Sequence, residues 1–461
     1  MPPKFGTSGL RGLVTELSAD LVGSYVSAFA RSCPVGTGVF VAHDLRPSSP
    51  SLAAVVIQAS RAAGVPVIDC GAVPTPALAL AASEAGAAAV MVTGSHIPTD
   101  RNGLKFYTPT GEITKAQEAG ILDAVAKPEP AASASVPEAA QGTDAACASR
   151  YIDRYVAAFG PDALGGMRLG IYAHSAVGRD VLATLLRALG ATTIELGRAD
   201  DFVPVDTEAV DAQTRDQLRN WAAAHQIDAI VSTDADGDRP LLTDEHGQVI
   251  AGDILGQITG LSLGAEVAVT PVTSNTGAEQ VFGRVIRTTV GSPYVIAGMQ
   301  AEAAAKVIGY EANGGFLLGY HANGLAPLMT RDAVLPLVTC LAQAKALGGL
   351  AAVVARQPAR FTAADRLQNI ATRTAQELVA RLTSDAQYRG RLTGLLDGVE
   401  AATDTRDGLR ISLRDGRIIH LRPSGNAPEL RLYVDASDPA CADQTLQAGL
   451  AAVETMIGTK K

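Results

Sequence analysis

The chain reads Ala87-Ala88-Ala89-Val90-Met91-Val92-Thr93-Gly94-Ser95-His96-Ile97-Pro98 from residue 87, an apolar run that passes directly into a polar loop. A continuous apolar run of this length is typical of a strand buried on both faces, as in a parallel sheet. Open α/β sheets bind their ligands at the carboxyl ends of the strands. The pattern therefore predicts an α/β sheet and places the Ser95 hydroxyl where a ligand binds.

The same order of apolar run and polar loop occurs twice more, at residues 228–234 and 306–311. Strand-like segments alternate with helix-like ones, which predicts βαβ units with largely parallel pairing. The repeat predicts three related mixed α/β domains, each of which contributes one loop from the same structural place. The strands expected in the first of them are 38–43, 65–69 and 87–93, and the helices are 49–63 and 75–86.

The C-terminal part of the chain has a different pattern. Residues 409–413 and 417–421 flank Arg414-Asp415-Gly416, which is a hairpin signal. A strand at 430–436 and a helix at 439–457 complete an α+β unit. The expected fold class is α/β, with three related mixed α/β domains and a C-terminal α+β domain around a central cleft. The predicted domains are 1–142, 143–250, 251–358 and 359–461, with an Ala/Pro/Ser/Glu-rich linker at 126–147.

Composition restricts the partners and the compartment. The net charge is −9 with neutral histidines and there is no basic stripe, so nucleic acid is not an expected partner. The five cysteines show no C-x-x-C spacing, which predicts reduced, buried thiols. The N-terminus lacks the apolar core of a signal peptide, and no uncharged apolar run is long enough to span a bilayer. We expect a cytoplasmic protein with no membrane partner, present as a monomer or weak dimer.

Three aspartates at alternate positions form the most specific motif, Thr233-Asp234-Ala235-Asp236-Gly237-Asp238-Arg239. Carboxylates this close repel one another unless a cation neutralises them, and hard oxygen ligands suit Mg²⁺ shared with a phosphate. One alternative is an acidic surface turn with Gly237 at positive φ. Another is a calcium loop, because Glu245 occupies the twelfth position counted from Asp234. The strand-like residues before Asp234, and Pro240 after the motif, favour magnesium.

Ser95 by itself has two interpretations. It is either a helix N-cap beside an ordinary loop histidine or a nucleophile. A serine hydroxyl is a poor nucleophile unless a base, a metal or an anion-stabilising group acts on it. Arg101 and Lys105 follow within reach and add two cations beside the hydroxyl. A serine that carries a phosphoryl group and an acidic loop that holds a metal together predict phosphoryl transfer.

Three further motifs each have a functional and an ordinary interpretation. The loop at residues 311–315 is either a polar turn or a site where Glu311 and Asn313 bind neighbouring sugar hydroxyls. Residues 422–429 form either a polar hairpin loop or an anion cradle. Arg11, in a glycine-rich segment without a Walker lysine, either binds phosphate or is a surface arginine. Side chains with only a structural interpretation are the Asp44–Arg46 pair at a strand end and His174, His225, His246 and His420.

Taken in chain order, the segments that contain Arg11, Ser95, the three aspartates, Glu311 and Arg422 resemble the motifs of the α-D-phosphohexomutase superfamily. This superfamily includes phosphomannomutases, phosphoglucomutases and phosphoglucosamine mutases. The resemblance covers essentially the whole chain. It implies a phosphoserine at Ser95, in a loop whose usual sequence in the family is Thr-Ala-Ser-His-Asn-Pro. It also implies one Mg²⁺ per chain, held by Ser95, Asp234, Asp236 and Asp238. The implied catalytic residues are Ser95, His96, Lys105, Arg11 and Arg239, and the implied substrate-binding residues are Glu311, Asn313, Arg422, Ser424, Gly425 and Asn426.

The chain departs from the family pattern at a few positions. Gly94 and Ile97 replace the usual Ala and Asn beside the serine, and Pro240 stands where a small or aliphatic residue is commoner. Many bacterial members carry a histidine where this chain has Gly315. One half of the acid/base pair is therefore unassigned, with His96 and Lys105 as the better candidates and His321 as a remote one.

The resemblance implies interconversion of hexose 6-phosphate and hexose 1-phosphate, in which Ser95 donates and recovers a phosphoryl group and a hexose 1,6-bisphosphate turns end for end. Mannose phosphate is the favoured substrate, with phosphoglucomutase and phosphoglucosamine mutase activities as alternatives. A metal-dependent serine phosphatase and a non-catalytic sugar-phosphate-binding protein are more distant alternatives. A separate C-terminal phosphate loop favours the mutase, because closure over the substrate excludes water from the phosphoserine.

Overall fold

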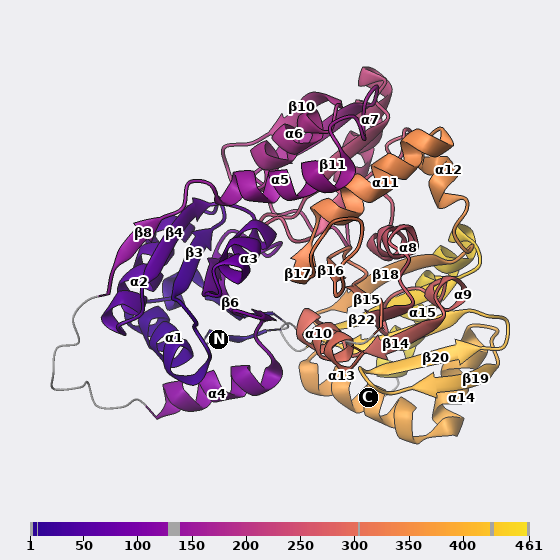
Figure 1. Ribbon diagram of the computed structural model, residues 1–461. Helices are drawn as coiled ribbons and strands as arrows, with labels where there is room; N and C mark the ends of the chain where they lie inside the picture. The colour runs from indigo at the N-terminus through magenta and orange to yellow at the C-terminus, as the bar shows by residue number, and fades with distance from the viewer. Residues whose placement is uncertain (1–2, 7, 128–138, 303–304, 425–427, 459–461) are drawn as a thin grey trace.

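The computed structural model describes residues 3–6, 8–127, 139–302, 305–424 and 428–458. Within these residues the chain forms four β-sheets, each accompanied by its own helices. Figure 1 shows them in chain order, with the indigo N-terminal sheet on one side of the molecule and the yellow C-terminal sheet on the other. The predicted class, mixed α/β units followed by a C-terminal α+β unit, is confirmed.

The first sheet has eight strands. The strands are β1 (Lys4–Phe5), β2 (Leu10–Leu13), β3 (Val39–His43), β4 (Val67–Ala72), β5 (Ala88–Val92), β6 (Arg101–Thr108), β7 (Gly111–Glu112) and β8 (Gln141–Thr143). The order is β1-β2-β6-β5-β3-β4-β8, with β7 paired to β6. Strand β3 pairs in parallel with β4 and β5, whereas β6 runs antiparallel to β5. The helices are α1 (Ala19–Ser32), α2 (Ser49–Ala62), α3 (Thr75–Glu84) and α4 (Lys115–Ala126), after a short 3₁₀ turn at Val14–Glu16.

The second sheet has four strands in the order β10-β9-β11-β12. The strands are β9 (Arg168–His174), β10 (Thr192–Arg198), β11 (Ala229–Thr233) and β12 (Pro240–Leu242), and the helices are α5 (Cys147–Phe159), α6 (Arg179–Ala188) and α7 (Ala212–His225). Strand β9 pairs in parallel with β10 and β11, and β12 runs antiparallel to β11. All five residues of β11 are buried, as a strand between two other strands and two helical layers requires.

The third sheet has five strands in the order β14-β13-β15-β16-β17. The strands are β13 (Val267–Pro271), β14 (Arg284–Thr288), β15 (Val307–Tyr310), β16 (Phe316–Leu318) and β17 (Leu328–Asp332). The helices are α8 (Gly252–Ser262), α9 (Ala278–Val281), α10 (Ser292–Ala301), α11 (Val334–Leu347) and α12 (Leu350–Val354). Strand β15 is parallel to β13 and antiparallel to β16.

The internal repeat predicted from the sequence is present in these three sheets. In each of them, a buried strand pairs in parallel on one side and antiparallel on the other, and these strands are β5, β11 and β15. Each predicted polar loop joins that strand to its antiparallel partner. The loops of Ser95, of Asp234 and of Glu311 therefore leave equivalent carboxyl ends.

The fourth sheet is wholly antiparallel, in the order β18-β22-β21-β20-β19. The strands are β18 (Phe361–Gln368), β19 (Glu400–Asp404), β20 (Leu409–Leu413), β21 (Ile418–Pro423) and β22 (Glu429–Ala436), and the helices are α13 (Thr372–Ser384), α14 (Ala386–Leu395) and α15 (Pro439–Gly458). The predicted hairpin at Arg414-Asp415-Gly416 is β20–β21, with Gly416 at φ 88°.

One buried apolar cluster continues through the first three units. It includes Leu78 of α3, Tyr151 of α5, Leu185 of α6, Leu255 of α8 and Leu337 of α11. A shared core of this kind fixes the three units relative to one another, and with them the three loops. The fourth sheet has a separate core, and its contacts with the third unit include polar ones such as Asp435 with the backbone N–H of Thr276, 2.8 Å.

The predicted linker at 126–147 is wrong in part. Residues 128–138 lie outside the described residues, but β8 pairs in parallel with β4 and extends the first sheet. The Ala/Pro/Ser-rich composition concealed this three-residue edge strand, because edge strands carry little apolar signal. After β12 the chain turns back and forms an isolated β-bridge between Thr243 and Val249.

Candidate active site

The Ser95 loop begins where β5 ends, as predicted, and holds the serine in an unusual backbone conformation. Ser95 has φ 53°, a left-handed value that is uncommon for residues other than glycine. Its N–H donates to Thr93 Oγ1 at 2.7 Å, and the Thr93 hydroxyl donates to Asp44 Oδ2 at 2.7 Å. The side chain is 3% exposed. The surrounding polar network therefore fixes the direction of the hydroxyl, and Ser95 is not a helix N-cap.

Arg46 holds the rest of this loop from beneath. Its guanidinium donates to four backbone carbonyl oxygens, those of Ser95, Ile97, Pro98 and Arg101, at 2.5–2.9 Å. It also pairs with Asp44 at 3.3 Å, the structural ion pair expected from the sequence.

The same arginine explains one departure from the family pattern. A Cβ atom at Gly94 would lie 2.6 Å from Arg46 Cζ, so even alanine does not fit there without a shift.

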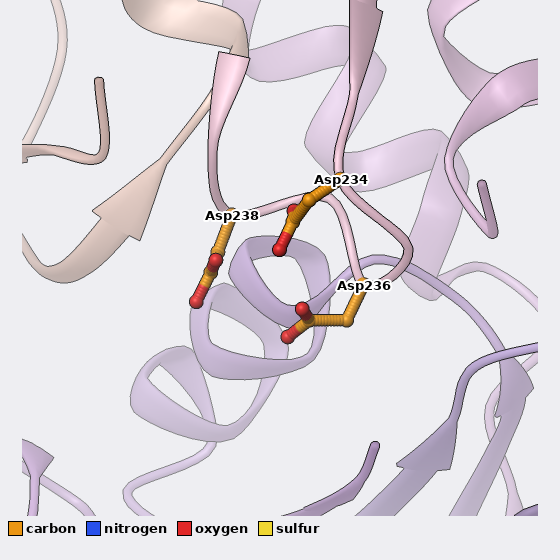
Figure 2. Close-up of side chains that lie close together, drawn as sticks. All are labelled: Asp234, Asp236 and Asp238. Atoms are coloured by element: carbon orange, nitrogen blue, oxygen red, sulfur yellow. The ribbon is translucent and has the colours of Figure 1, made fainter. Parts of the chain in front are cut away.

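The three aspartates lie in the loop between β11 and β12, and all are 0% exposed. Figure 2 shows their side chains leaving this one loop with the carboxylates turned toward the same side. Gly237 provides the predicted positive φ, 77°. Ser95 Oγ donates to Asp234 Oδ2 at 2.6 Å, and Thr75 Oγ1 donates to Asp236 Oδ2 at 2.5 Å. The acidic surface turn is excluded, because the loop is buried against the first unit.

Burial and mutual repulsion act on the charges of this group. The pKa of Asp234 is raised well above its usual value by burial and by the carboxylates of Asp236 and Asp238. Burial acts in the same direction on Asp236 and Asp238, but nearby cations lower the pKa of both. Lys105 Nζ lies 2.5 Å from a carboxylate oxygen of each, and Arg331 Nη2 lies 2.7 Å from Asp238.

The triad fits a divalent cation. One carboxylate oxygen from each aspartate lies within 4.8 Å of the others. Among the described residues, no other group of three or more Asp, Glu, His or Cys side chains is arranged closely enough to hold a metal ion. Oδ1 of Asp236 and Oδ1 of Asp238 are buried without a hydrogen-bond partner among the described residues. Such oxygens are costly unless a cation binds them.

A calcium loop of the twelve-residue kind is not formed. Glu245 accepts the N–H of Ala351 at 3.2 Å instead of joining the triad, and strands rather than helices flank the motif.

The third loop is tied to the triad by an arginine that the sequence did not single out. Arg331 of β17 donates to Asp238 at 2.7 and 3.1 Å and to Glu311 at 3.1 Å. A Cβ atom at Gly315 would lie 2.5 Å from Arg331 Cδ. The absence of the histidine common at this place therefore has a steric reason, since Arg331 occupies the space. Its position between two active loops depends on β16–β17 pairing, for which the sequence has no local signal.

His96 and Arg239, two of the remaining predicted residues, lie beside Ser95. Arg239 Nη1 donates to His96 Nδ1 at 2.9 Å, and His96 Nδ1 is 3.4 Å from Ser95 Oγ. Burial and the Arg239 charge lower the pKa of His96 to about 3. Arg11 lies in β2, opposite Gly103 of β6, and burial lowers its pKa to about 10 although the charges of Asp236 and Asp238 raise it.

The other histidines do not join the site. His174 and His420 are buried, with Nε2 beside the backbone oxygens of Thr233 and Asp407, and His321 is exposed.

The fourth sheet contributes a row of arginines. Arg422 of β21, Arg431 of β22 and Arg366 of β18 are direct cross-strand neighbours. Arg422 Nε also donates to Asp407 at 2.9 Å, and Ser424 is buried at the end of β21. Gly425 and Asn426 lie outside the described residues. Of the row, only Arg422 was predicted, because Arg366 and Arg431 stand in strands without a recognisable motif.

A segment that the sequence analysis did not select runs between the loops. Phe202 packs under Arg46 with 4.0 Å from the guanidinium carbon to the ring centroid, and Thr207 Oγ1 donates to the backbone oxygen of Asn313 at 2.8 Å. We refer to residues 202–208 as the bridging segment. It follows the carboxyl end of β10, so the rule that places ligands at strand ends identifies it in retrospect.

The chain matches four family models, in the order of the chain. These are phosphoglucomutase/phosphomannomutase α/β/α domain I (residues 2–132), domain II (149–247), domain III (243–361) and the C-terminal domain (368–451). Together they span most of the sequence.

Similar proteins agree with the family models. The chain is 44% identical to a phosphomannomutase of Sinorhizobium fredii (99% of each chain covered) and 41% identical to one of Salmonella muenchen (98% and 96%). A phosphoglucosamine mutase of Symbiobacterium thermophilum is 28% identical (98% and 99%). A phosphoglucomutase/phosphomannomutase family structure from Burkholderia thailandensis shares the fold, with TM-score 0.76 and 22% identity over 97% of each chain. The chain therefore belongs to the phosphoglucomutase/phosphomannomutase family of α-D-phosphohexomutases and is a phosphomannomutase-like isomerase.

Proposed function

We propose that this protein interconverts mannose 6-phosphate and mannose 1-phosphate, with Ser95 as the residue that donates and recovers the phosphoryl group. The observation that carries the proposal is the 2.6 Å hydrogen bond from Ser95 Oγ to Asp234 within a buried triad of aspartates. A hydroxyl beside three carboxylates is a poor site for an anion unless cations compensate, and Lys105 lies against two of the three.

Asp234, Asp236 and Asp238, with an oxygen on Ser95, would hold one Mg²⁺ per chain. The ion would neutralise charge that develops on the transferring phosphoryl group. Lys105, Arg239 and Arg11 add positive charge around Ser95 Oγ. Burial of the site excludes water, which would otherwise hydrolyse the phosphoserine. His96 holds its ring against Arg239 and so positions that guanidinium beside Ser95.

The other end of the substrate has its own anion site. Arg422 and Ser424, together with Gly425 and Asn426, are proposed to bind the phosphate that is not reacting, and Glu311 and Asn313 to bind sugar hydroxyls. Two anion sites are needed because a hexose 1,6-bisphosphate presents each of its phosphates to Ser95 in turn. The cleft between these sites is proposed to be formed by domains at 1–142, 143–250, 251–358 and 359–461.

Mannose phosphate is proposed as the preferred substrate because the relatives at 44% and 41% identity are named phosphomannomutase, whereas those named phosphoglucosamine mutase are at 27–29%. Glucose phosphate is the substrate to compare first, since glucose and mannose differ only at C2. We further propose a cytoplasmic monomer or weak dimer. In the described residues, no helix is both long enough and apolar enough to cross a membrane.

The test is incubation with mannose, glucose or glucosamine 1-phosphate, Mg²⁺ and the matching 1,6-bisphosphate. The 6-phosphate should accumulate fastest from mannose, without free phosphate; release of free phosphate alone would show a hydrolase instead. Ser95→Ala should lower turnover by about 10⁴-fold or more while binding of mannose 6-phosphate changes little. Ser83→Ala, at an exposed serine of α3, is the matched control.

A further inference from the structure

Phosphoryl transfer to a sugar hydroxyl requires a group that accepts the hydroxyl proton, and the groups expected from the sequence are already engaged. His96 Nδ1 accepts the N–H of Arg239 at 2.9 Å. Lys105 lies between Asp236 and Asp238, 2.5 Å from each. Glu311 pairs with Arg331 at 3.1 Å. Each of these side chains has a partner that competes for the lone pair or proton it would use.

The bridging segment carries a carboxylate without such a partner. Among the described residues, no hydrogen bond or ion pair engages the carboxylate of Glu208, and its side chain is exposed to solvent. The segment itself is fixed at three points, by Phe202 under Arg46, by the Val203 N–H on Ser175 Oγ at 2.8 Å, and by Thr207 on Asn313. Glu208 is therefore held next to the sugar-binding loop while its carboxylate is free to react.

Ionisable groups from three units lie near enough to Glu208 to affect its charge. Asp206 and Arg239 belong to the second unit and Glu311 to the third, while Arg431 and Tyr433 belong to β22 of the fourth. The side chain thus reaches solvent from a place that protein surrounds on several sides, between the proposed sugar and phosphate sites. These elements remove part of the water around the Glu208 carboxylate, and this partial desolvation, with the neighbouring Asp206 carboxylate, raises the pKa of Glu208 to about 7. General bases work best when their pKa lies near the operating pH.

Asp206 is the other carboxylate of the segment, and it is a poorer candidate. Its Oδ1 accepts the N–H of Glu208 at 3.1 Å. Burial alone would raise its pKa, but the neighbouring His96 and Arg239 side chains lower it. A carboxylate whose ionised form is stabilised in this way is a weak proton acceptor.

We propose that Glu208 is the general base and acid for the sugar hydroxyl, an inference that rests on the proposed mutase function. In the first transfer the sugar oxygen forms a bond to the phosphorus on Ser95, and its proton moves to the Glu208 carboxylate. The P–Oγ bond breaks, its electron pair stays on Ser95 Oγ, and a proton from solvent restores the Ser95 hydroxyl. The second transfer reverses each step with the other phosphate, so the leaving sugar oxygen recovers the proton from Glu208.

The experiment compares Glu208→Gln with the wild type and with Asp201→Asn, a neutralised exposed carboxylate outside the bridging segment. The wild-type kcat should rise with pH through about 7. Glu208→Gln should lose this rise and about 10²- to 10⁴-fold of kcat, with the dissociation constant of mannose 6-phosphate almost unchanged. Glu208→Asp should recover part of the rate, and Asp201→Asn should behave as wild type.

Different results separate the two proposals. If the wild type forms no hexose 6-phosphate from any hexose 1-phosphate, the proposed function is wrong. If the wild type is active and Glu208→Gln keeps either its rate or the rise of kcat near pH 7, the function stands and Glu208 is not the proton acceptor. Far-ultraviolet circular dichroism of each variant confirms that the rates compare folded proteins.

Discussion

Ser95 Oγ and Asp234 Oδ2 are 2.6 Å apart, although 139 residues separate them in the chain. The contact exists because β5 and β11 end in equivalent loops and because a continuous apolar core joins their units. The proposed phosphoryl acceptor and the proposed cation ligands therefore meet at an interface between two units. Anything that shifts one unit against the other separates them, so the stability of this interface and the activity are coupled.

The triad should bind Mg²⁺ in the absence of substrate. Removal of metal with a chelator should abolish activity, and Mg²⁺ should raise the melting temperature of the wild type because it relieves repulsion between buried carboxylates. Asp236→Asn removes one ligand charge and should weaken Mg²⁺ binding by more than about 10-fold in isothermal titration calorimetry. Asp216→Asn, at an exposed position on α7, should leave binding unchanged. Equal Mg²⁺ affinity of the Asp236→Asn and wild-type proteins would contradict the assignment of the site.

Gly315 should not tolerate the histidine that many relatives carry. A Cβ atom there meets Arg331 Cδ at 2.5 Å, so Gly315→His should displace Arg331 from Asp238 and Glu311 and cost about 1–3 kcal/mol of stability. Thermal unfolding gives the shift, and activity should fall with it. Gly390→Ala, in α14 with no atom near the added Cβ, should be neutral or slightly stabilising. A Gly315→His protein as stable as the wild type would mean that Arg331 moves without cost.

Asp253 of α8 should make stability depend on pH. Burial, with a smaller effect of Asp435, raises its pKa from 3.8 to about 6, and its Oδ1 has no hydrogen-bond partner among the described residues. The folded state therefore favours the neutral acid. Its contribution to stability is full below the unfolded pKa near 3.8 and is lost as the pH rises through about 6.

Asp253→Asn removes this loss while keeping an oxygen to accept the Asn275 N–H. Urea unfolding should show the variant more stable than the wild type by about 1–3 kcal/mol at pH 8. The advantage should shrink toward pH 4.5. An advantage that is constant between these two pH values would assign the effect to packing and not to ionisation.

Local sequence patterns were sufficient for the strand–loop units, because a buried strand and the polar residues after it are adjacent in the chain. Ser95 and the aspartates of the second loop were found in this way. Arg331 and Glu208 were not found, because neither lies in a motif. Arg331 is placed by the pairing of β17 with β16 and by the space beside Gly315. Glu208 is placed by the hydrogen bond that anchors the bridging segment to Asn313. Such positions follow from tertiary packing, which a single sequence does not display.

The arginine row of the fourth sheet should be an anion site that extends beyond Arg422. Like charges directly opposite on neighbouring strands are destabilising, and Arg366, Arg431 and Arg422 occupy such positions. Glu429 compensates in part, since its carboxylate accepts Arg431 Nε at 2.9 Å. A bound phosphate would relieve the remaining repulsion, so inorganic phosphate should raise the melting temperature of the wild type.

Arg431→Gln should reduce this phosphate-induced shift and raise the KM for mannose 6-phosphate by about 10-fold, with a smaller effect on kcat, because the interaction is made equally in the ground and transition states. The wild-type KM should also increase with salt, since exposed arginines attract phosphate less strongly when they are screened. Arg373→Gln, at an arginine of α13 whose side chain is 90% exposed, controls for the loss of one positive charge. If both variants change KM equally, the row acts only through net charge, and Arg431 is not part of a built phosphate site.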